Sequence, residues 1–194
     1  GGILNGNLDI VQQNGIYVPD SDVSIEKFMF NDYMLGDLRA DIVGNQSLTN
    51  YTVDLFLRND NLKSLDITGN IDVSATNSNI DLDVEFREFD LEPLNVFGAD
   101  VITNIRGLAS GDVKVSGDIK KPQIDGQLIL DNAGLAIPYL NVDYAFDFDT
   151  EVTLKDQRFV FNDVVLTDSE FFSKATLNGF LSHQNFSDWR LGLD

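Results

Sequence analysis

The chain has 194 residues, and its 32 acidic side chains against 13 basic ones give a formal net charge of -19. Such a surface repels phosphate backbones, because nucleic-acid affinity comes largely from cationic side chains that displace counterions. An anionic lipid leaflet is repelled in the same way. Nucleic-acid binding and electrostatic docking on a membrane are therefore excluded.

The composition predicts a folded, mostly β protein. Hydrophobic residues make up 43% of the chain and include 14 Phe, enough for a sizeable core. Among the polar residues, 26 Asp and 18 Asn stand against 6 Glu. Asp and Asn favour turns and caps, whereas Glu favours helix interiors, so strands and turns are expected to dominate. The chain has no Cys, which excludes a disulfide framework and a thiolate metal site.

Apolar and polar residues alternate with a period of two along most of the chain, as they do in β-strands. The first clear run is 51–57, and the cleanest is 80–87, where apolar residues at even positions alternate with charged residues at odd positions. Each run has one apolar and one polar face, which predicts an antiparallel sheet with one side in water. Further strands are expected at residues 65–73, 113–115, 128–130, 144–148, 159–161, 175–177 and 189–193.

Glycine followed by a polar and then an apolar residue recurs at uneven separations, at Gly6, Gly36, Gly69, Gly111, Gly117 and Gly126. The spacing is too irregular for a propeller or a strict solenoid. Glycine within a strand weakens pairing but allows a sheet to bend or coil. We therefore expect a single domain over residues 1–194, built as a long meander that its glycines curve. The start without Met and the abrupt end indicate a fragment of a longer protein.

The segment from Asp90 to Gly107 breaks the alternation. Asp90 is a suitable N-cap, Pro93 stands in the first turn, and Gly107 suits a C-terminal stop. These features predict one short amphipathic helix near 91–105, which either packs on the sheet or plugs a groove. Its apolar residues at helical spacing are Leu94, Phe97, Val101 and Ile105.

Residues suited to catalysis are scarce. His183 is the only histidine, and its neighbours Ser182, Gln184 and Asn185 predict a solvated hairpin turn. A Ser-His-Asp or Cys-His arrangement is therefore not expected. Phosphate-binding glycine loops are missing, and a zinc ligand set cannot be assembled. We predict that the chain is not an enzyme and has no catalytic residue, no cofactor and no metal.

Several aspartates come in pairs that place two carboxylates on one strand face. None of the pairs continues into the glycine- and glutamate-bearing loop of an EF-hand. Glycoside hydrolases also use two carboxylates. Most of the carboxylates here lie on the polar side of alternating strands, and their solvation explains them without catalysis. The pairs are Asp20 with Asp22, Asp81 with Asp83, and Asp147 with Asp149.

The apolar faces of the predicted strands must be shielded from water. At ~4.8 Å per strand, roughly 14 strands would form a sheet ~65 Å long. Such a sheet, left flat, would expose far more apolar surface than the few hundred Å² that soluble monomers tolerate. Two sheets packed as a sandwich, a closed barrel, or a gutter whose lining meets something apolar would each solve this, and composition does not choose among them.

Residues 107–128 carry an ordered set of features: a glycine-led strand, a Gly-polar-apolar step, a short turn with Pro122, and an apolar-polar-Gly step that opens the next strand. This order resembles the AsmA-like superfamily, in particular the TamB translocation and assembly module proteins. Further segments that fit the same order are 35–38, 91–105, 133–144 and 176–179.

The resemblance implies a β-sheet curled into a taco-like groove with an apolar interior. It further implies a periplasmic part of a protein anchored in the inner membrane of a Gram-negative-type bacterium. Members are thought to carry phospholipid between the inner and outer membranes and to support outer-membrane protein assembly with a partner of the TamA/BamA type. No catalysis is implied.

A groove of this kind holds acyl chains inside while headgroups stay in water. Two alternatives remain open: a module that binds unfolded strands of outer-membrane proteins by β-augmentation, and a β-sandwich interaction domain with a dry core. The residues predicted to line the lipid groove are Val53, Leu55, Leu57, Ile67, Ile71, Val73, Ile80, Leu82, Val84, Phe86, Val113, Val115, Leu128, Leu130, Tyr144, Phe146, Phe148 and Leu177.

Overall fold

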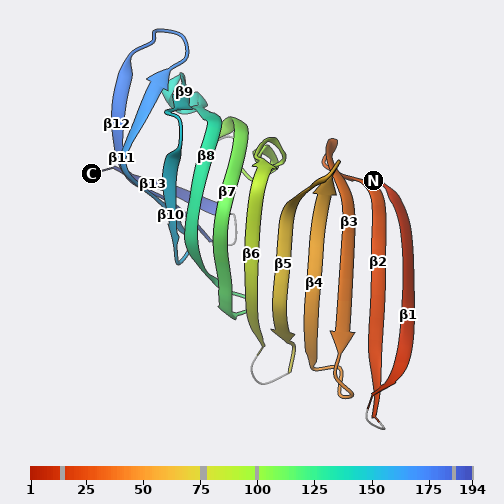
Figure 1. Cartoon of the computed structure of the whole chain (residues 1–194). Helices are drawn as coiled ribbons and strands as arrows, with labels where there is room; N and C mark the ends of the chain where they lie inside the picture. The colour runs from red at the N-terminus through yellow and green to blue at the C-terminus, as the bar shows by residue number, and fades with distance from the viewer. Residues whose placement is uncertain (14–15, 75–77, 99–100, 185–186, 194) are drawn as a thin grey trace. The chain divides into compact units, whose positions relative to one another are not determined.

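A computed structural model describes residues 1–13, 16–74, 78–98, 101–184 and 187–193 (Figure 1). Its secondary structure is nearly all β, which confirms the predicted fold class, and the described residues contain no helix of seven or more residues. The elements are β1 (Ile3–Gln13), β2 (Ile16–Phe30), β3 (Tyr33–Gly44), β4 (Asn50–Asn59), β5 (Leu62–Asp72), β6 (Asn79–Asp90), η1 (Glu92–Val96), β7 (Thr103–Asp118), β8 (Gln123–Ile137), η2 (Pro138–Leu140), β9 (Val142–Phe146), β10 (Thr150–Lys155), β11 (Arg158–Asp168), β12 (Lys174–Gln184) and β13 (Ser187–Leu193).

The described strands belong to one sheet, in which each strand from β1 to β8 is hydrogen-bonded to the next in sequence. The order continues through β10, β11, β12 and β13, while β9 pairs with β8 and β11. This is the predicted antiparallel meander. It is not the two-sheet sandwich that the composition also allowed.

The chain forms two compact units, and each is described by itself. The N-terminal unit comprises residues 1–85 and 114–123, and the C-terminal unit comprises residues 86–113 and 124–194.

In the N-terminal unit, the strand register aligns the apolar alternation of three neighbouring strands. Leu57 lies opposite Leu38 on one side and Leu65 on the other. Leu55 likewise pairs with Ile67. Because a slip of one residue would turn every side chain to the opposite face, this match fixes the register. Leu38, Leu57 and Leu65 therefore share one face, together with Leu55 and Ile67.

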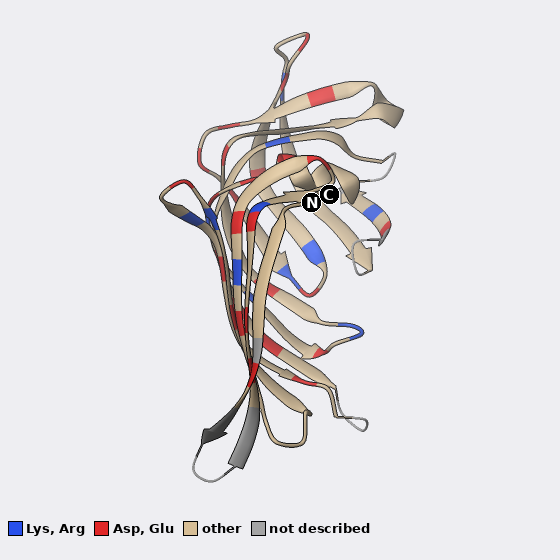
Figure 2. Cartoon of the chain, turned by 90° about the vertical axis from the view of Figure 1, so that its right-hand side faces the viewer, with Lys and Arg blue, Asp and Glu red and all other residues tan. Residues whose placement is uncertain are grey.

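Acidic residues recur along the strands of the N-terminal unit (Figure 2). Asp54 stands between Val53 and Leu55 in β4 and lies opposite Asp41 in β3, so this acidic pair is on the other face. The ammonium of Lys114 lies 2.6 Å from the Asp81 carboxylate and 3.0 Å from that of Asp83. The hydrogen bonds that the ammonium donates to the carboxylates of Asp81 and Asp83 raise the pKa of Lys114 above its usual value. This pair of carboxylates thus has a structural partner, a lysine on the neighbouring strand β7.

In the C-terminal unit, β9 and β10 lie end to end between the same two neighbours. β8 pairs with β10 through residues 126–130 and with β9 through residues 134–137. The turn 147–149 separates the two short strands. Phe148 in this turn is 72% exposed.

Two strands of this unit change the parity of their buried residues part-way along. In β8, Leu130 is buried before Asn132 and Ala133 after it, and Asn132 has a left-handed φ of 49°. In β11 the register shifts between Phe161 and Val164, both of which are buried. Such bulges insert one residue and let the same face stay apolar while the sequence alternation changes phase.

The helix predicted near 91–105 is wrong in extent. Within the described part of this segment, residues 91–98 and 101–105, only η1 is helical, a single 3-10 segment of five residues, and Ile105 lies in β7. The chain turns at Gly98, whose carbonyl oxygen accepts hydrogen bonds from the amides of Val101 and Ile102 at 3.1 Å. The side-chain amide of Asn95 then binds both backbone groups of Ile105, at 2.7 and 2.8 Å, and holds it extended.

Gly111 in β7 marks a close approach between strands. Its φ is 144°, and a Cβ built there would overlap with the carbonyl oxygen of Gln127 in β8. Gly117 in the same strand has a φ of 91°, but a Cβ there would meet nothing within 4 Å. Only glycine suits both the backbone conformation and the spacing at residue 111.

Candidate apolar binding site

Two adjoining apolar cavities lie in the C-terminal unit. We name them the inner pocket, of about 160 Å³, and the outer pocket, of about 300 Å³. Because five side chains line both cavities, we treat the two as one apolar trough. The shared residues are Ile102, Leu135, Phe146, Phe161 and Leu181.

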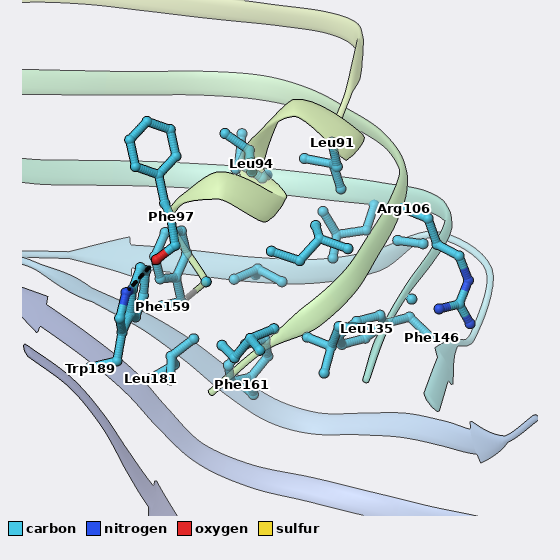
Figure 3. Close-up of a pocket in the computed structure, with 18 residues that line it drawn as sticks. Leu91, Leu94, Phe97, Arg106, Leu135, Phe146, Phe159, Phe161, Leu181 and Trp189 are labelled. Atoms are coloured by element: carbon cyan, nitrogen blue, oxygen red, sulfur yellow. Dashed lines mark hydrogen bonds between the residues drawn. The ribbon is translucent and has the colours of Figure 1, made fainter. Parts of the chain in front are cut away.

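The inner pocket lies between the η1 segment and the sheet (Figure 3). Leu91, Leu94 and Phe97 form the wall on the η1 side. Apolar side chains at alternate positions of the strands form the other wall, which is why period-two sequences build it. The strand residues are Leu128 and Leu130 of β8, Val152 of β10, and Phe159 and Phe161 of β11.

Trp189 of β13 stands at one end of the inner pocket (Figure 3). Its indole Nε1 donates a hydrogen bond to the carbonyl oxygen of Phe97 at 2.8 Å. Its ring stacks on Phe159, with the centroids 6.3 Å apart. The last strand is thereby tied to the wall that η1 provides.

Arg106 stands at the opposite end and is the charged residue among the described residues of this lining (Figure 3). Its Nη2 donates to Oδ1 of Asp143 at 2.7 Å. Burial by itself raises the pKa of the Asp143 carboxyl. The hydrogen bonds that it accepts from Arg106, Asn104 and Ser169 lower the pKa, as does the Arg106 charge. Together they outweigh burial and hold the pKa below its usual value of 3.8. The ion pair therefore persists at neutral pH, and the positive charge at this end of the trough is balanced.

The outer pocket extends from the shared walls to η2. Ile137, Leu140 and Tyr144 line its η2 end. Residues 175–178 of β12 and Leu191 of β13 line it as well. Leu140 is 51% exposed, so this end of the trough reaches the protein surface.

The trough has the chemistry of a site for a hydrocarbon. Most of its walls are aliphatic and aromatic side chains, and the polar side chains among the described lining residues are those of Arg106, Tyr144, Thr176 and Asn178. A dry apolar cavity of about 150 Å³ already holds a molecule the size of benzene, so the inner pocket alone accommodates several methylene groups. The outer pocket, at about 300 Å³, is at the lower end of ordinary ligand sites.

Five of the residues predicted to line a groove meet in this trough. Leu128 and Leu130 line the inner pocket, Tyr144 and Leu177 line the outer pocket, and Phe146 lines both. They come from three strands of the C-terminal unit, β8, β9 and β12, which the antiparallel pairing of β9 and β12 with β11 brings together.

The other predicted residues lie outside the two pockets. Val113 is buried in β7, whereas Phe148 is exposed in the turn after β9. Phe86 is half-buried, and its ring meets that of Phe89 edge-on, with centroids 5.5 Å apart. The rest lie in the N-terminal unit: Val53, Leu57 and Val84 are buried, Val73 is 44% exposed, and the half-buried ones are Leu55, Ile67, Ile71, Ile80, Leu82 and Val115.

Several lining residues were not predicted as such. Phe159, Phe161 and Trp189 were recognised as apolar strand positions, so their alternation was the available signal. Leu91, just before η1, and Ile102, just before β7, had no such signal, because their place in the wall depends on the turn at Gly98.

His183 does not lie in a solvated turn, so that prediction is wrong. It belongs to β12 and is 5% exposed. Its ring centroid lies 5.6 Å from that of Phe159 and 5.0 Å from that of Trp189. Burial lowers the pKa of the imidazole below 6.5, which favours the neutral form.

The buried imidazole predicts a loss of stability on mild acidification. Above pH 6.5 the side chain is neutral in both the folded and unfolded states; below it the unfolded state takes up the proton first. The free energy of unfolding should therefore fall from about pH 6.5 downward, by up to about 1.4 kcal/mol per pH unit. Urea unfolding at pH 7.5, 6.5 and 5.5 measures this. In His183→Phe the decline over this range should be smaller, and an identical decline would contradict the assignment.

Comparison with protein-family models, curated proteins and solved structures finds no match for this chain. In the described part of the chain, no helix is both long and apolar enough to cross a membrane. The described residues also contain no group of three or more His, Cys, Asp or Glu placed to hold a metal ion.

Proposed function

We propose that the chain is a non-enzymatic binding module whose trough takes up the acyl chains of phospholipid. The observation that carries this proposal is the continuous apolar lining of the inner and outer pockets, which reaches the surface at Leu140. Polar groups lie at its Arg106 end, where the ion pair with Asp143 meets the apolar walls. An amphiphile has the same division between a long apolar part and a polar end.

The energetics suit transfer better than tight storage. Each methylene that leaves water gains about 0.8 kcal/mol, but a methylene that leaves a bilayer forfeits about as much. Movement of an acyl chain between a bilayer and the trough is therefore nearly isoenergetic. Apolar contacts, which predominate in the lining, have no direction, so they let a chain slide.

The wider role in this proposal rests on the resemblance of residues 107–144 to the TamB type. In that role the module is periplasmic, within a protein anchored in the inner membrane. It conducts phospholipid between the inner and outer membranes and supports outer-membrane protein assembly with a partner of the TamA/BamA type. The anionic surface excludes nucleic acid as a partner.

The proposal predicts that Leu135→Arg weakens acyl-chain binding. Leu135 is half-buried and lines both pockets, so a guanidinium there places a charge inside the trough. Titration of the protein with a fluorescent fatty acid below its micelle concentration should show saturable binding, weakened at least about tenfold in the variant.

The matched control is Ile129→Arg on the same strand, β8. Ile129 is 43% exposed and lies between the buried Leu128 and Leu130, so it points away from the trough. Binding in this variant should equal that of the wild type, and native mass spectrometry should find lipid on both. Absence of saturable binding to the wild-type chain would refute the proposed function.

A second candidate function is supported by β1, which pairs only with β2 among the described residues and stands at the sheet edge. Ile3, Leu4 and Ile10 are 60%, 67% and 73% exposed. An extended peptide adds to such an edge through backbone hydrogen bonds. Binding of an unfolded outer-membrane strand would then protect β1 amides from hydrogen exchange, and unchanged exchange would count against this function.

A further inference from the structure

Four large apolar residues are exposed at one end of the C-terminal unit. Tyr139 and Leu140 in η2 are 93% and 51% exposed, and Phe171 and Phe172 in the turn after β11 are 73% and 78% exposed. We name these four residues the aromatic tip. Single exposed apolar residues are common, but a cluster of aromatic ones marks an interaction surface.

The two parts of the aromatic tip are neighbours, because β9 pairs with both β8 and β11 (Figure 1). Ile137, just before η2, lies opposite Val142, and Tyr144 lies opposite Asp168, just before the second turn. The amide of Ser169 donates to the carbonyl oxygen of Asp143 at 2.8 Å. The four side chains therefore stand on adjacent loops at the same end of the strands.

The turn between β11 and β12 is built to present its aromatic residues outward. Oδ1 of Asp168 accepts hydrogen bonds from the amides of Glu170 and Phe171, at 2.9 and 2.7 Å. Phe172 has a left-handed φ of 56°, a conformation that is rare for a bulky residue. Strained conformations of this kind persist mainly where function requires them.

The aromatic tip is continuous with the trough. Leu140 belongs to the tip and also lines the outer pocket, followed inward by Ile137 and Tyr144. The outer pocket shares Phe146 and Phe161 with the inner pocket. An acyl chain that leaves a bilayer at the tip therefore meets apolar side chains at each step into the trough.

The charges beside the tip select the kind of bilayer. A recess between its two loops is lined by Asp143, Asp168 and Glu170. Asp143 is paired with Arg106, so the other two carboxylates leave the recess anionic. Anionic lipid would be repelled there, whereas a zwitterionic surface, which brings ammonium groups along with phosphates, is compatible.

We propose that the aromatic tip inserts into the interface of a zwitterionic bilayer and is the mouth through which acyl chains enter the trough. Tyr side chains are enriched at the headgroup level of bilayers, and Phe and Leu side chains of interfacial proteins are buried at the boundary with the acyl chains. The proposal deepens the proposed function and rests on it for the entry of lipid. Contact of the tip with a bilayer stands on its own observations.

The test is flotation of the full 194-residue chain with phosphatidylcholine vesicles in a density gradient. The wild type should float. The double variant Phe171→Ser with Phe172→Asn should lower the partition coefficient at least about tenfold, since burial of one large apolar side chain is worth about that factor. Asn tolerates the left-handed backbone at residue 172, so the turn is retained.

The matched control is Phe148→Ser, because Phe148 is 72% exposed but lies in the turn between β9 and β10. It should float like the wild type. Flotation of the double variant at the wild-type level, or stronger binding to phosphatidylglycerol than to phosphatidylcholine vesicles, would overturn the proposal.

Binding of the dispersed fatty acid separates this inference from the proposed function. All three proteins should bind it equally, which also shows that the trough is folded. If the wild type binds the fatty acid but does not float, the proposal for the aromatic tip is overturned and the proposed function of the trough is retained. A wild type that floats through the tip but does not bind the fatty acid supports the tip as a membrane contact and refutes the trough.

Discussion

Replacement of Phe161 by alanine is expected to lower the free energy of unfolding by about 3–5 kcal/mol. Phe161 is 7% exposed, and its ring stacks on that of Phe146 with centroids 6.3 Å apart. The substitution removes an entire buried ring, and the loss of transfer free energy is increased by the cavity that remains. Because Phe161 lines both pockets, the cavity enlarges the trough.

Guanidinium unfolding measures the stability, and Phe171→Ala is the matched control. Phe171 is 73% exposed, so its loss should change the free energy of unfolding by less than about 0.5 kcal/mol. Equal effects of the two variants would mean that residue 161 is not part of a packed core. Bulky aromatic probes that the wild type binds weakly should bind more tightly to Phe161→Ala, as they do to other engineered apolar cavities.

Gly111→Ala should destabilise the protein by about 3 kcal/mol. Alanine costs about 1–2 kcal/mol in a left-handed conformation, and overlap of the new methyl group with the carbonyl oxygen of Gln127 adds a packing penalty of similar size. The strands β7 and β8 must separate locally to admit it. For a chain of this length, thermal unfolding should shift by about 2–4 °C for each kcal/mol.

Gly117→Ala distinguishes backbone strain from the close approach. Gly117 has a left-handed φ of 91° but no atom near the position of a Cβ, so only the conformational cost of about 1–2 kcal/mol applies. Gly111→Ala should therefore be the more damaging of the two. If both variants lose the same stability, the approach of β8 to Gly111 is looser than described.

The strands were predicted well from the sequence, because a strand with one buried face has apolar residues at every second position. The alternation at Val53–Leu57 appears in the structure as β4, and Leu55 faces Ile67 across the strand pair as the two alternations require. A period of two with one apolar face has no other common interpretation. Connections between consecutive strands are short, so order in the sheet follows order in the chain.

The departures have a different physical origin. A bulge such as the one at Asn132 changes the phase of the alternation without an unambiguous local signature, since Asn also suits turns. The apolar residues of the η1 segment fit helical spacing, but the side chain of Asn95 pairs with the backbone of Ile105 from ten residues away and favours the strand. Burial of His183 likewise depends on Phe159 and Trp189, which lie on other strands.

The candidate site was predictable only in part for the same reason. Leu128, Leu130 and Phe146 belong to runs in which large apolar residues recur at every second position, and this period assigns each run to one face. Phe97 joins them through a hydrogen bond from Trp189, and no local pattern reveals that contact. Alternation identifies which side of a strand is apolar; which apolar sides enclose a space is decided by contacts between distant segments.

The hydrogen bond between Trp189 and Phe97 joins residues 92 positions apart, whereas most strand pairs join neighbours in sequence. Local hairpins lose little loop entropy when they close, so they form early in folding, and contacts between distant segments form late. The meander of the C-terminal unit can therefore assemble strand by strand before the η1 wall meets β13. Until that last step its apolar face lies open to water, and a nascent chain would be most prone to aggregation in this interval.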